Sequence, residues 1–350
     1  MIAPWIPGVV PGEKRMKKCR RQHNVKGFYK GLLAATGLFA VYVAGAGATV
    51  YANAMIRSSS KPDRNYDPEE EKEYIVPTEK SSQYRQAAYN YNIWWNTRDR
   101  EFVEIMSTDG LRLRGSILRA ENDKAAGRIA IVVHGHLCCA GEEGFISKMF
   151  HDAGYDVLAV DQRAHGKSDG ETLTMGRMEA ADVVEWARYA ADRYLDEKIV
   201  LYGASMGGNS VLRTADRALP KNVVCIIDDC GYCRADEAIL QSLRHDFSGI
   251  LFKEAVNAAC SVTYRILQGA SIKNTDASGP VSRAKVPVLF IHGTDDSIVD
   301  CSDSRRLYAL HPGKKKLLIF DGVKHNCSFF SDRERYTQEV FDFIDSCCEG

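Results

Sequence analysis

Short apolar runs alternate with amphipathic stretches from residue 128 to the end of the chain. The apolar runs are continuous, as in strands that are buried on both faces of a sheet. They predict strands at 129–133, 156–160, 198–202, 223–227, 286–292 and 316–320. The stretches between them predict helices at 141–153, 174–195, 206–219, 301–310 and 332–346. This alternation predicts a mostly parallel sheet that helices cover on both faces.

One gap interrupts the alternation. Residues 233–285 are too long for a plain crossover between strands and contain an amphipathic run from Ile250 to Leu267. We interpret this segment as a helical cap inserted into the sheet domain. Ahead of the alternating region, residues 101–107 and 111–118 form a strand-like pair joined by Asp109-Gly110, a strong hairpin signal. A helix is expected before this hairpin, over residues 78–97, where apolar residues recur at a spacing of three to four.

The neutral stretch from Gly31 to Ile56 contains no charged residue. About 20 apolar residues cross a bilayer as a helix, so this stretch is long enough to do so. One possibility is therefore a transmembrane anchor. The other is a signal peptide, because Ala52-Asn53-Ala54 resembles a signal-peptidase site. Cleavage after Ala54 would leave a secreted protein. The long basic region and long apolar run favour an uncleaved, single-pass anchor.

Charge is distributed unevenly along the chain. The 350 residues have a formal net charge of zero, but residues 1–30 hold eight basic residues against one acid, a net charge of +7, and residues 57–350 carry the balancing −7. By the positive-inside rule, the basic tail stays in the cytoplasm and the rest of the chain lies outside. An acidic body and a neutral total argue against nucleic-acid binding.

We therefore divide the chain into four parts. They are a basic cytoplasmic tail (1–30), a transmembrane helix or signal anchor (31–56), a polar linker with the leading helix (57–100), and an α/β domain (101–350) whose cap is near 233–285.

The segment Gly203-Ala204-Ser205-Met206-Gly207 reads G-x-S-x-G between a predicted strand and a predicted helix. A nucleophile on such a sharp turn needs small neighbours, and the turn exposes its hydroxyl at the carboxyl edge of the sheet. Ser205 is the candidate nucleophile. The alternative is a glycine-rich turn with a helix-capping serine.

A serine needs a base to become a nucleophile, and two later segments offer partners. His325 follows the last predicted strand, and the segment His292 to Val299 follows the strand before it. Both lie at strand carboxyl ends, where α/β folds build their sites. The chain order Ser…Asp…His fits a doubly wound hydrolase, with His325 as the base and a carboxylate of the earlier segment orienting it.

The strand at 129–133 leads into His134-Gly135-His136. A turn at this position presents a backbone N–H towards the nucleophile, so the N–H groups of His136 and Met206 are the candidate oxyanion hole. Together with Cys138 and Cys139, the two histidines also resemble a metal-ligand string. Alternating strand residues point to opposite faces and no second cluster is obvious, so we expect no metal.

With these motifs in order, the chain resembles the α/β-hydrolase superfamily over residues 101–346, and most of all its small serine esterases with a short cap. The fold implied is a doubly wound, mostly parallel sheet with a helical cap insertion. The family pattern places the acid at Asp296, four residues after His292. Asp295 is the neighbouring alternative, and Asp228 or Asp229 the more distant one. Asp161–Gly170 matches a loop beside the site whose residues are mostly structural.

The resemblance implies a serine hydrolase that cleaves an acyl bond, preferably a carboxylic ester, through Ser205, His325, Asp296 and an acyl-enzyme, without a cofactor. Serine at 205 argues against members with an aspartate nucleophile. Apolar cap residues favour an apolar acyl or aromatic group: Leu243, Phe247, Leu251 and Phe252. A peptidase or acyltransferase on the same triad and a non-catalytic, membrane-tethered binding module are the alternatives. The physiological substrate and the oligomeric state stay open.

Ten of the 11 cysteines follow the neutral stretch. Outside the cytosol such a set could form disulfides, but Cys138-Cys139 and Cys347-Cys348 are neighbours along the chain and awkward to bridge. The pairing stays open, and a thiol-rich domain is in tension with a location outside the cell.

Overall fold

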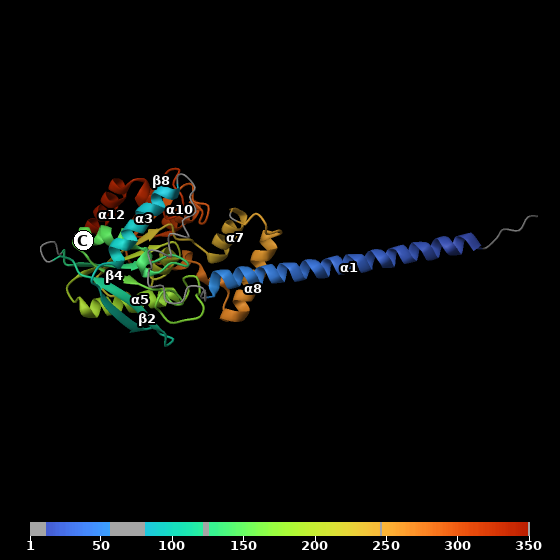
Figure 1. Ribbon diagram of the computed structural model, residues 1–350, viewed down its shortest axis with the longest axis horizontal. Helices are drawn as coiled ribbons and strands as arrows, with labels where there is room; N and C mark the ends of the chain where they lie inside the picture. Colours follow the sequence, from blue (N-terminus) through green and yellow to red (C-terminus); the bar gives the residue numbers. More distant parts are fainter. Residues whose placement is uncertain (1–11, 57–80, 122–125, 246, 349–350) are drawn as a thin grey trace, which may run out of the picture.

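Eight strands form one sheet in the computed structural model, which describes residues 12–56, 81–121, 126–245 and 247–348 (Figure 1). Their spatial order is β1-β2-β4-β3-β5-β6-β7-β8. The strands are β1 (Glu101–Met106), β2 (Arg112–Leu118), β3 (Arg128–Val133), β4 (Asp156–Val160), β5 (Lys198–Ala204), β6 (Val223–Asp229), β7 (Val288–Gly293) and β8 (Lys315–Phe320). The six strands from β3 to β8 run parallel, whereas β1 and β2 form the antiparallel hairpin at one edge. The predicted mostly parallel sheet is confirmed.

Helices cover both faces of this sheet, as expected from strands that are apolar throughout. One face packs against α3 (Ser81–Asn96), α4 (Gly144–Asp152) and α12 (Arg333–Cys348), with Trp95, Phe150 and Ile344 fully buried. The opposite face packs against α5 (Glu179–Arg193), α6 (Met206–Leu212), α9 (Ser278–Ser282) and α10 (Cys301–Leu310). The leading helix α3 is thus part of the core of the sheet domain.

The segment between β6 and β7 contains the expected helical insertion. It forms α7 (Ala235–His245), α8 (Lys253–Gln268) and a short 3-10 turn, η3 (Ile272–Thr275). Buried residues of this cap pack against Met206, the residue after the candidate nucleophile. The cap therefore lies over the carboxyl edge of the sheet, where β5 ends.

The N-terminal helix α1 (Gly12–Met55) is a single rod of 44 residues that projects from the body (Figure 1). Its segment Leu32–Met55 has a mean hydropathy of 1.7 and is long and apolar enough to cross a membrane. The sequence predicted a helix only over the neutral stretch. The structure extends it back through most of the basic tail, whose straight-chain residues also favour a helix.

The last turns of α1 are packed into the cap. Tyr51 and Met55 are buried at 2% and 0% exposure. The Tyr51 hydroxyl accepts a hydrogen bond from Gln268, and the Met55 carbonyl accepts one from the backbone N–H of Leu173. A Cβ atom on Gly47 would lie 2.5 Å from the Cβ of Ala259, so glycine is what lets α1 and α8 approach this closely.

Two predicted helices are shorter than expected, for local reasons. The expected helix at 174–195 begins only at Glu179, because the Glu179 carboxylate accepts hydrogen bonds from Thr174 and Gly176 and closes a turn ahead of it. The expected helix at 206–219 ends at Leu212. There the Thr214 hydroxyl bonds to the Val211 carbonyl and competes with the helical ladder. The predicted linker at 57–77 lies outside the described residues.

Candidate active site

Ser205 sits on a strained turn between β5 and α6. Its φ of 54° and ψ of −113° are rare for a residue with a side chain. A Cβ on Gly203 would lie 2.2 Å from the Gly207 carbonyl oxygen, and one on Gly207 would lie 2.2 Å from the Val133 oxygen. Both glycines are therefore required sterically. The Ser205 N–H donates to the Asp229 carbonyl at 2.8 Å and fixes the turn to β6.

Three of the predicted site residues form one chain of hydrogen bonds. The Nε2 atom of His325 lies 2.9 Å from Ser205 Oγ, and its Nδ1 atom lies 2.6 Å from Asp296 Oδ2. The His325 side chain is 15% exposed and the Asp296 side chain 0%. The imidazole is thus placed to accept a proton from Ser205 while Asp296 holds its other nitrogen.

The Asp296 carboxylate is supported on all sides. Its Oδ1 atom accepts hydrogen bonds from the N–H groups of Ile298 and Val299, each at 2.9 Å, and His292 Nε2 lies 3.1 Å from Oδ2. Burial opposes ionisation of Asp296, but the bonds from His292, His325 and the backbone outweigh it and hold its pKa well below the usual range. Asp296 is therefore ionised.

The alternative acids point elsewhere. The Asp229 carboxylate accepts hydrogen bonds from the hydroxyls of Tyr202 and Tyr336, at 3.1 and 2.7 Å. Asp228 accepts the N–H of Gly231, and burial raises its pKa to about 8. Asp295 is exposed at the surface. The bond to His325 Nδ1 is made by Asp296.

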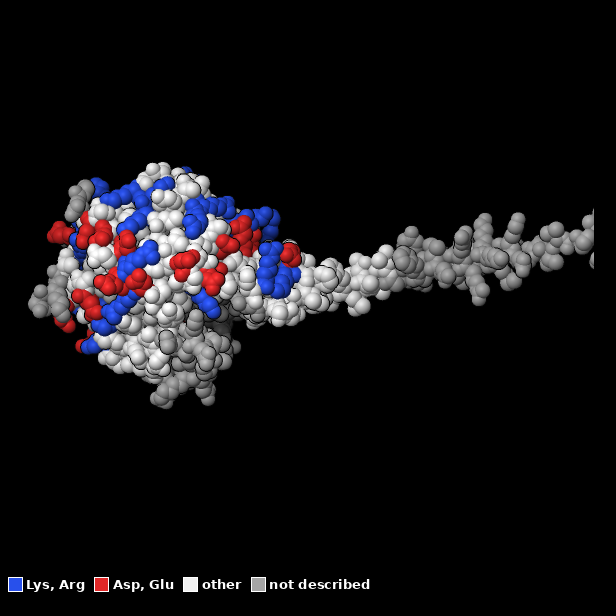
Figure 2. Space-filling view, turned by 90° about the horizontal axis from the view of Figure 1, so that it is seen from above, with Lys and Arg blue, Asp and Glu red and all other residues white. Residues whose placement is uncertain are grey.

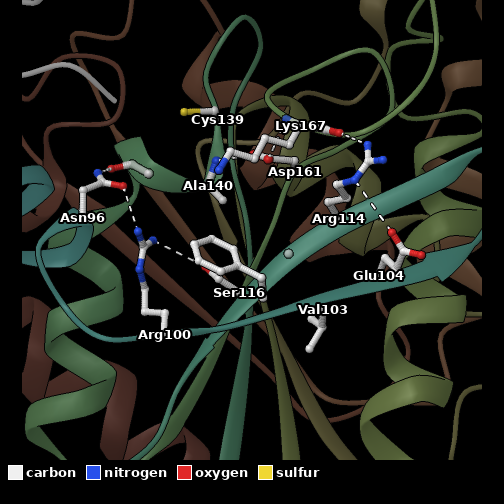
Figure 3. A pocket seen from close by; sticks show the side chains of 13 residues that line it. Asn96, Arg100, Val103, Glu104, Arg114, Ser116, Cys139, Ala140, Asp161 and Lys167 are labelled. Atoms are coloured by element: carbon white, nitrogen blue, oxygen red, sulfur yellow. Dashed lines mark hydrogen bonds and ion pairs between the residues drawn. The ribbon is translucent and has the colours of Figure 1, made fainter. Parts of the chain in front are cut away.

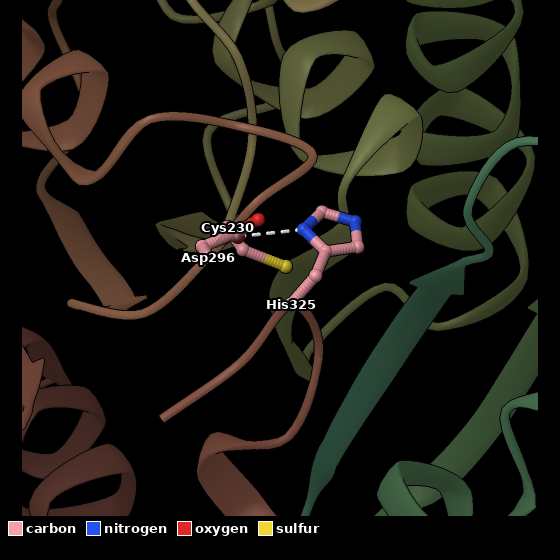
Figure 4. A group of neighbouring side chains, drawn as sticks. All are labelled: Cys230, Asp296 and His325. Carbon is pink, nitrogen blue, oxygen red and sulfur yellow. Dashed lines mark hydrogen bonds and ion pairs between the residues drawn. The ribbon is translucent and has the colours of Figure 1, made fainter. Parts of the chain in front are cut away.

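Cys230 lies against this group (Figure 4). One ligand atom each of Cys230, Asp296 and His325 lie within 4.8 Å of one another, a spacing that could admit a metal ion. The dashed line in Figure 4 joins only His325 to Asp296, and burial raises the pKa of the Cys230 thiol well above its usual value. A metal here would have to displace the proton between His325 and Asp296.

The two histidines of the turn after β3 have different partners. The buried His134 ring accepts the N–H of Gln162 at 3.0 Å, whereas the His136 ring donates to the carbonyl of Ala54, at the end of α1, at 2.6 Å. A Cβ on Gly135 would lie 3.5 Å from Ser205 Cβ, so this turn passes beside the candidate nucleophile. The oxyanion role of the His136 and Met206 N–H groups stays a prediction.

The loop Asp161–Gly170 is held by bonds to neighbouring segments and by one within the loop, as expected for a structural loop. The Arg163 side chain is 4% exposed, and its guanidinium pairs with Asp182 at 2.7 Å and Asp109 at 2.9 Å. The Asp161 carboxylate accepts the N–H groups of Ala140 and Lys167.

A separate cavity of about 670 Å³ lies at the β1–β2 edge of the sheet (Figure 3). Arg100, Arg114 and Lys167 line it together with Glu104 and Asp161. None of the predicted triad or oxyanion residues reaches this cavity, so we treat it as distinct from the candidate active site.

Two contributors to the site were missed by sequence reasoning. His292 served only to locate Asp296 in the sequence, yet its side chain contacts the Asp296 carboxylate. Their spacing of four residues could have indicated this contact. The end of α1, whose Ala54 carbonyl receives the His136 ring, left no signal in the sequence. The ten cysteines that follow α1 are not joined in disulfides, so the expected tension with an extracellular location stands.

A family model described as alpha/beta hydrolase fold matches residues 131–270. The chain has the α/β-hydrolase fold. It is 27% identical over 199 residues to the uncharacterized protein YqkD of Bacillus subtilis, and 26% identical over 217 residues to a caffeoylshikimate esterase of Arabidopsis thaliana. These alignments cover 57% and 52% of this chain and 65% of each relative.

Solved structures have the same fold. The Pyrococcus furiosus esterase Pf2001 superposes with a TM-score of 0.57 at 22% identity, and covers 71% of this α/β-hydrolase-fold chain and 92% of its own. The helix α1 precedes the residues that the family model matches.

Proposed function

We propose that this chain is a membrane-anchored serine hydrolase that cleaves a carboxylic ester. The observation that carries the proposal is the continuous hydrogen-bonded chain from Ser205 through His325 to Asp296, with spacings of 2.9 and 2.6 Å. A serine on a strained strand-to-helix turn, a histidine after the last strand and an ionised carboxylate together match the requirements of acyl transfer.

In the proposed reaction, Ser205 Oγ attacks the acyl carbonyl while His325 Nε2 takes its proton. The N–H groups of His136 and Met206 stabilise the oxyanion of the tetrahedral intermediate. His325 then donates the proton to the leaving alkoxide, and an acyl-enzyme forms. Water, deprotonated by His325, attacks the acyl-enzyme, and His325 returns the proton to Ser205 Oγ as the acid is released. Asp296 keeps Nδ1 protonated and stabilises the imidazolium in both steps.

The ester preference rests on two supports. A plant relative is named a caffeoylshikimate esterase and a structural neighbour is named an esterase. The inner face of the cap is also apolar: Ile239, Leu243 and Val256 pack in the same cluster as Met206, beside the candidate nucleophile. A peptidase or acyltransferase on the same residues is the second candidate, and a panel of ester, peptide and acyl-acceptor substrates separates them.

The decisive test is labelling of the full-length chain, purified in detergent, with a fluorophosphonate probe that reacts with activated serines. We expect the parent chain to be labelled and Ser205→Ala to lose all labelling. Ser282→Ala, at an exposed position on α9, is the matched control and should keep it. Equal labelling of Ser205→Ala, or none in the parent, overturns the proposal, and the latter favours a binding module.

The assignment of the acid is tested by two neighbouring substitutions. Asp296→Asn removes the charge that faces His325, and we expect kcat to fall by about 10²–10⁴-fold. Asp295→Asn is the control at an exposed neighbour and should change kcat little. Kinetics on a soluble aryl ester measure both, and a larger loss at Asp295 refutes the assignment of Asp296.

A further inference from the structure

The cap exposes a group of large apolar side chains beside α1. At its tip, which we define as residues 247–252, Phe247, Leu251 and Phe252 are 52%, 61% and 57% exposed. Along the outer face of α8, Val262 and Ile266 are 58% and 73% exposed and lie one turn apart. Soluble proteins rarely leave such a patch to water without a partner.

This patch is continuous with α1. The Phe252 ring packs edge-on against Phe39, with centroids 4.9 Å apart, and the N–H of Leu251 donates to the Tyr42 hydroxyl at 2.9 Å. Further along, Gly47 contacts Ala259. The two helices therefore run side by side in the same direction, and the cap tip lies beside the part of α1 around Phe39 and Tyr42.

The length of α1 ahead of the cap indicates where the cap tip would lie relative to a bilayer. The apolar segment Leu32–Met55 is 24 residues long, or about 36 Å at 1.5 Å per residue, against a hydrocarbon thickness of about 30 Å. The part ahead of the first contact with the cap, residues 32–38, spans only about 10 Å. If α1 crosses a bilayer, as proposed above, the cap tip must enter the lipid with it.

The charges near the tip are compatible with this position. Arg244 pairs with Glu254 at 2.8 Å, and the Lys253 ammonium donates to the Arg244 carbonyl at 3.1 Å. Figure 2 shows basic and acidic side chains next to each other where α1 leaves the body. Long basic side chains can extend to the headgroups while their stems stay in lipid, and aromatic residues with Lys and Arg are typical of interfacial segments.

We propose that the cap tip and the outer face of α8 are seated in the bilayer leaflet nearest the hydrolase domain, so that α1 and the cap form one membrane-inserted unit. The occupant of the exposed apolar patch is therefore lipid. The proposal rests on the anchor role of α1 but not on the chemistry of Ser205.

Single tryptophans introduced into the full chain test this. Phe252→Trp and Val262→Trp report on the patch, Leu33→Trp reports on α1, and Leu195→Trp, 78% exposed after α5, is the matched control. Each variant is placed in nanodiscs of phosphatidylcholine with or without brominated acyl chains. The parent chain, which has four tryptophans of its own, supplies the background.

We expect bromine to quench the added fluorescence of Leu33→Trp, Phe252→Trp and Val262→Trp and to leave that of Leu195→Trp unchanged. The proposal is overturned, while the anchor stands, if Leu33→Trp is quenched but Phe252→Trp or Val262→Trp is quenched no more than Leu195→Trp. No quenching of Leu33→Trp overturns both the anchor and the seated cap. The melting temperature of each variant, compared with that of the parent chain, reports folding independently of Ser205.

Discussion

At the residue scale, two buried carboxyls have pKa values shifted in opposite directions. As whole residues, both Asp296 and Glu143 are buried. Asp296 is surrounded by hydrogen-bond donors, whereas the Oε2 atom of Glu143 is buried without a partner. Burial accordingly raises the pKa of Glu143 to about 8, although a backbone bond from Gly135 opposes it. The number of donors, and not burial alone, decides the charge.

Glu143 therefore makes stability depend on pH. Below about pH 4 the carboxyl is protonated in both the folded and the unfolded chain. Between there and pH 8 the unfolded chain loses the proton while the folded one keeps it, so stability falls as pH rises and levels off above the folded pKa. We expect Glu143→Gln to raise the melting temperature more at pH 8 than at pH 5. Thermal unfolding in detergent at both pH values measures this, and an equal change at both contradicts it.

At the scale of elements, the sequence predicted the strands better than the helix contacts. All six parallel strands lie within two residues of their expected positions, because continuous apolar runs are bounded by polar turns. Ser205 and His325 were recognisable because each follows such a strand. The docking of α1 was not recognisable. The exposed residues of α1 and the residues that face the cap have the same apolar composition, so Gly45 and Gly47 look equivalent in sequence.

The structure distinguishes these two glycines. A Cβ on Gly47 would meet α8, whereas one on Gly45 would meet nothing within 4 Å. We expect Gly47→Leu to push α1 away from α8, destabilise the chain by about 1–3 kcal/mol and weaken fluorophosphonate labelling. Gly45→Leu is the matched control and should change neither. Melting temperatures in detergent compare them, and equal effects of the two substitutions argue against the docked arrangement.

At the scale of the whole molecule, charge is separated along the long axis. The tail before the neutral stretch carries a net charge of +7, and the chain after this stretch carries −7. The body lies at the end of α1 opposite to the tail (Figure 1). Such asymmetry favours an orientation with the tail in the cytoplasm. If cleavage occurred after Ala54, it would also separate Tyr51 and Gly47 from the cap into which they pack. We therefore expect α1 to be retained.

Protease added to intact cells tests this arrangement. With one epitope at each end of the chain, we expect the C-terminal epitope to be digested and the N-terminal one to be protected, and both to be found in a single band before digestion. A protected C-terminal epitope would contradict the proposed orientation. Separate bands in untreated cells would indicate cleavage.

The packing of α1 against α8 also constrains the order of events during synthesis. Tyr42 bonds to Leu251, 209 residues later in the chain. At 5–20 residues per second, about 10–40 s pass after α1 leaves the ribosome before its partner helix exists. The first element made thus waits for a late one, and a lipid environment would cover its apolar surface meanwhile. A chain interrupted before α8 would display an unpaired helix surface, a feature by which a quality-control system could distinguish incomplete chains from finished ones.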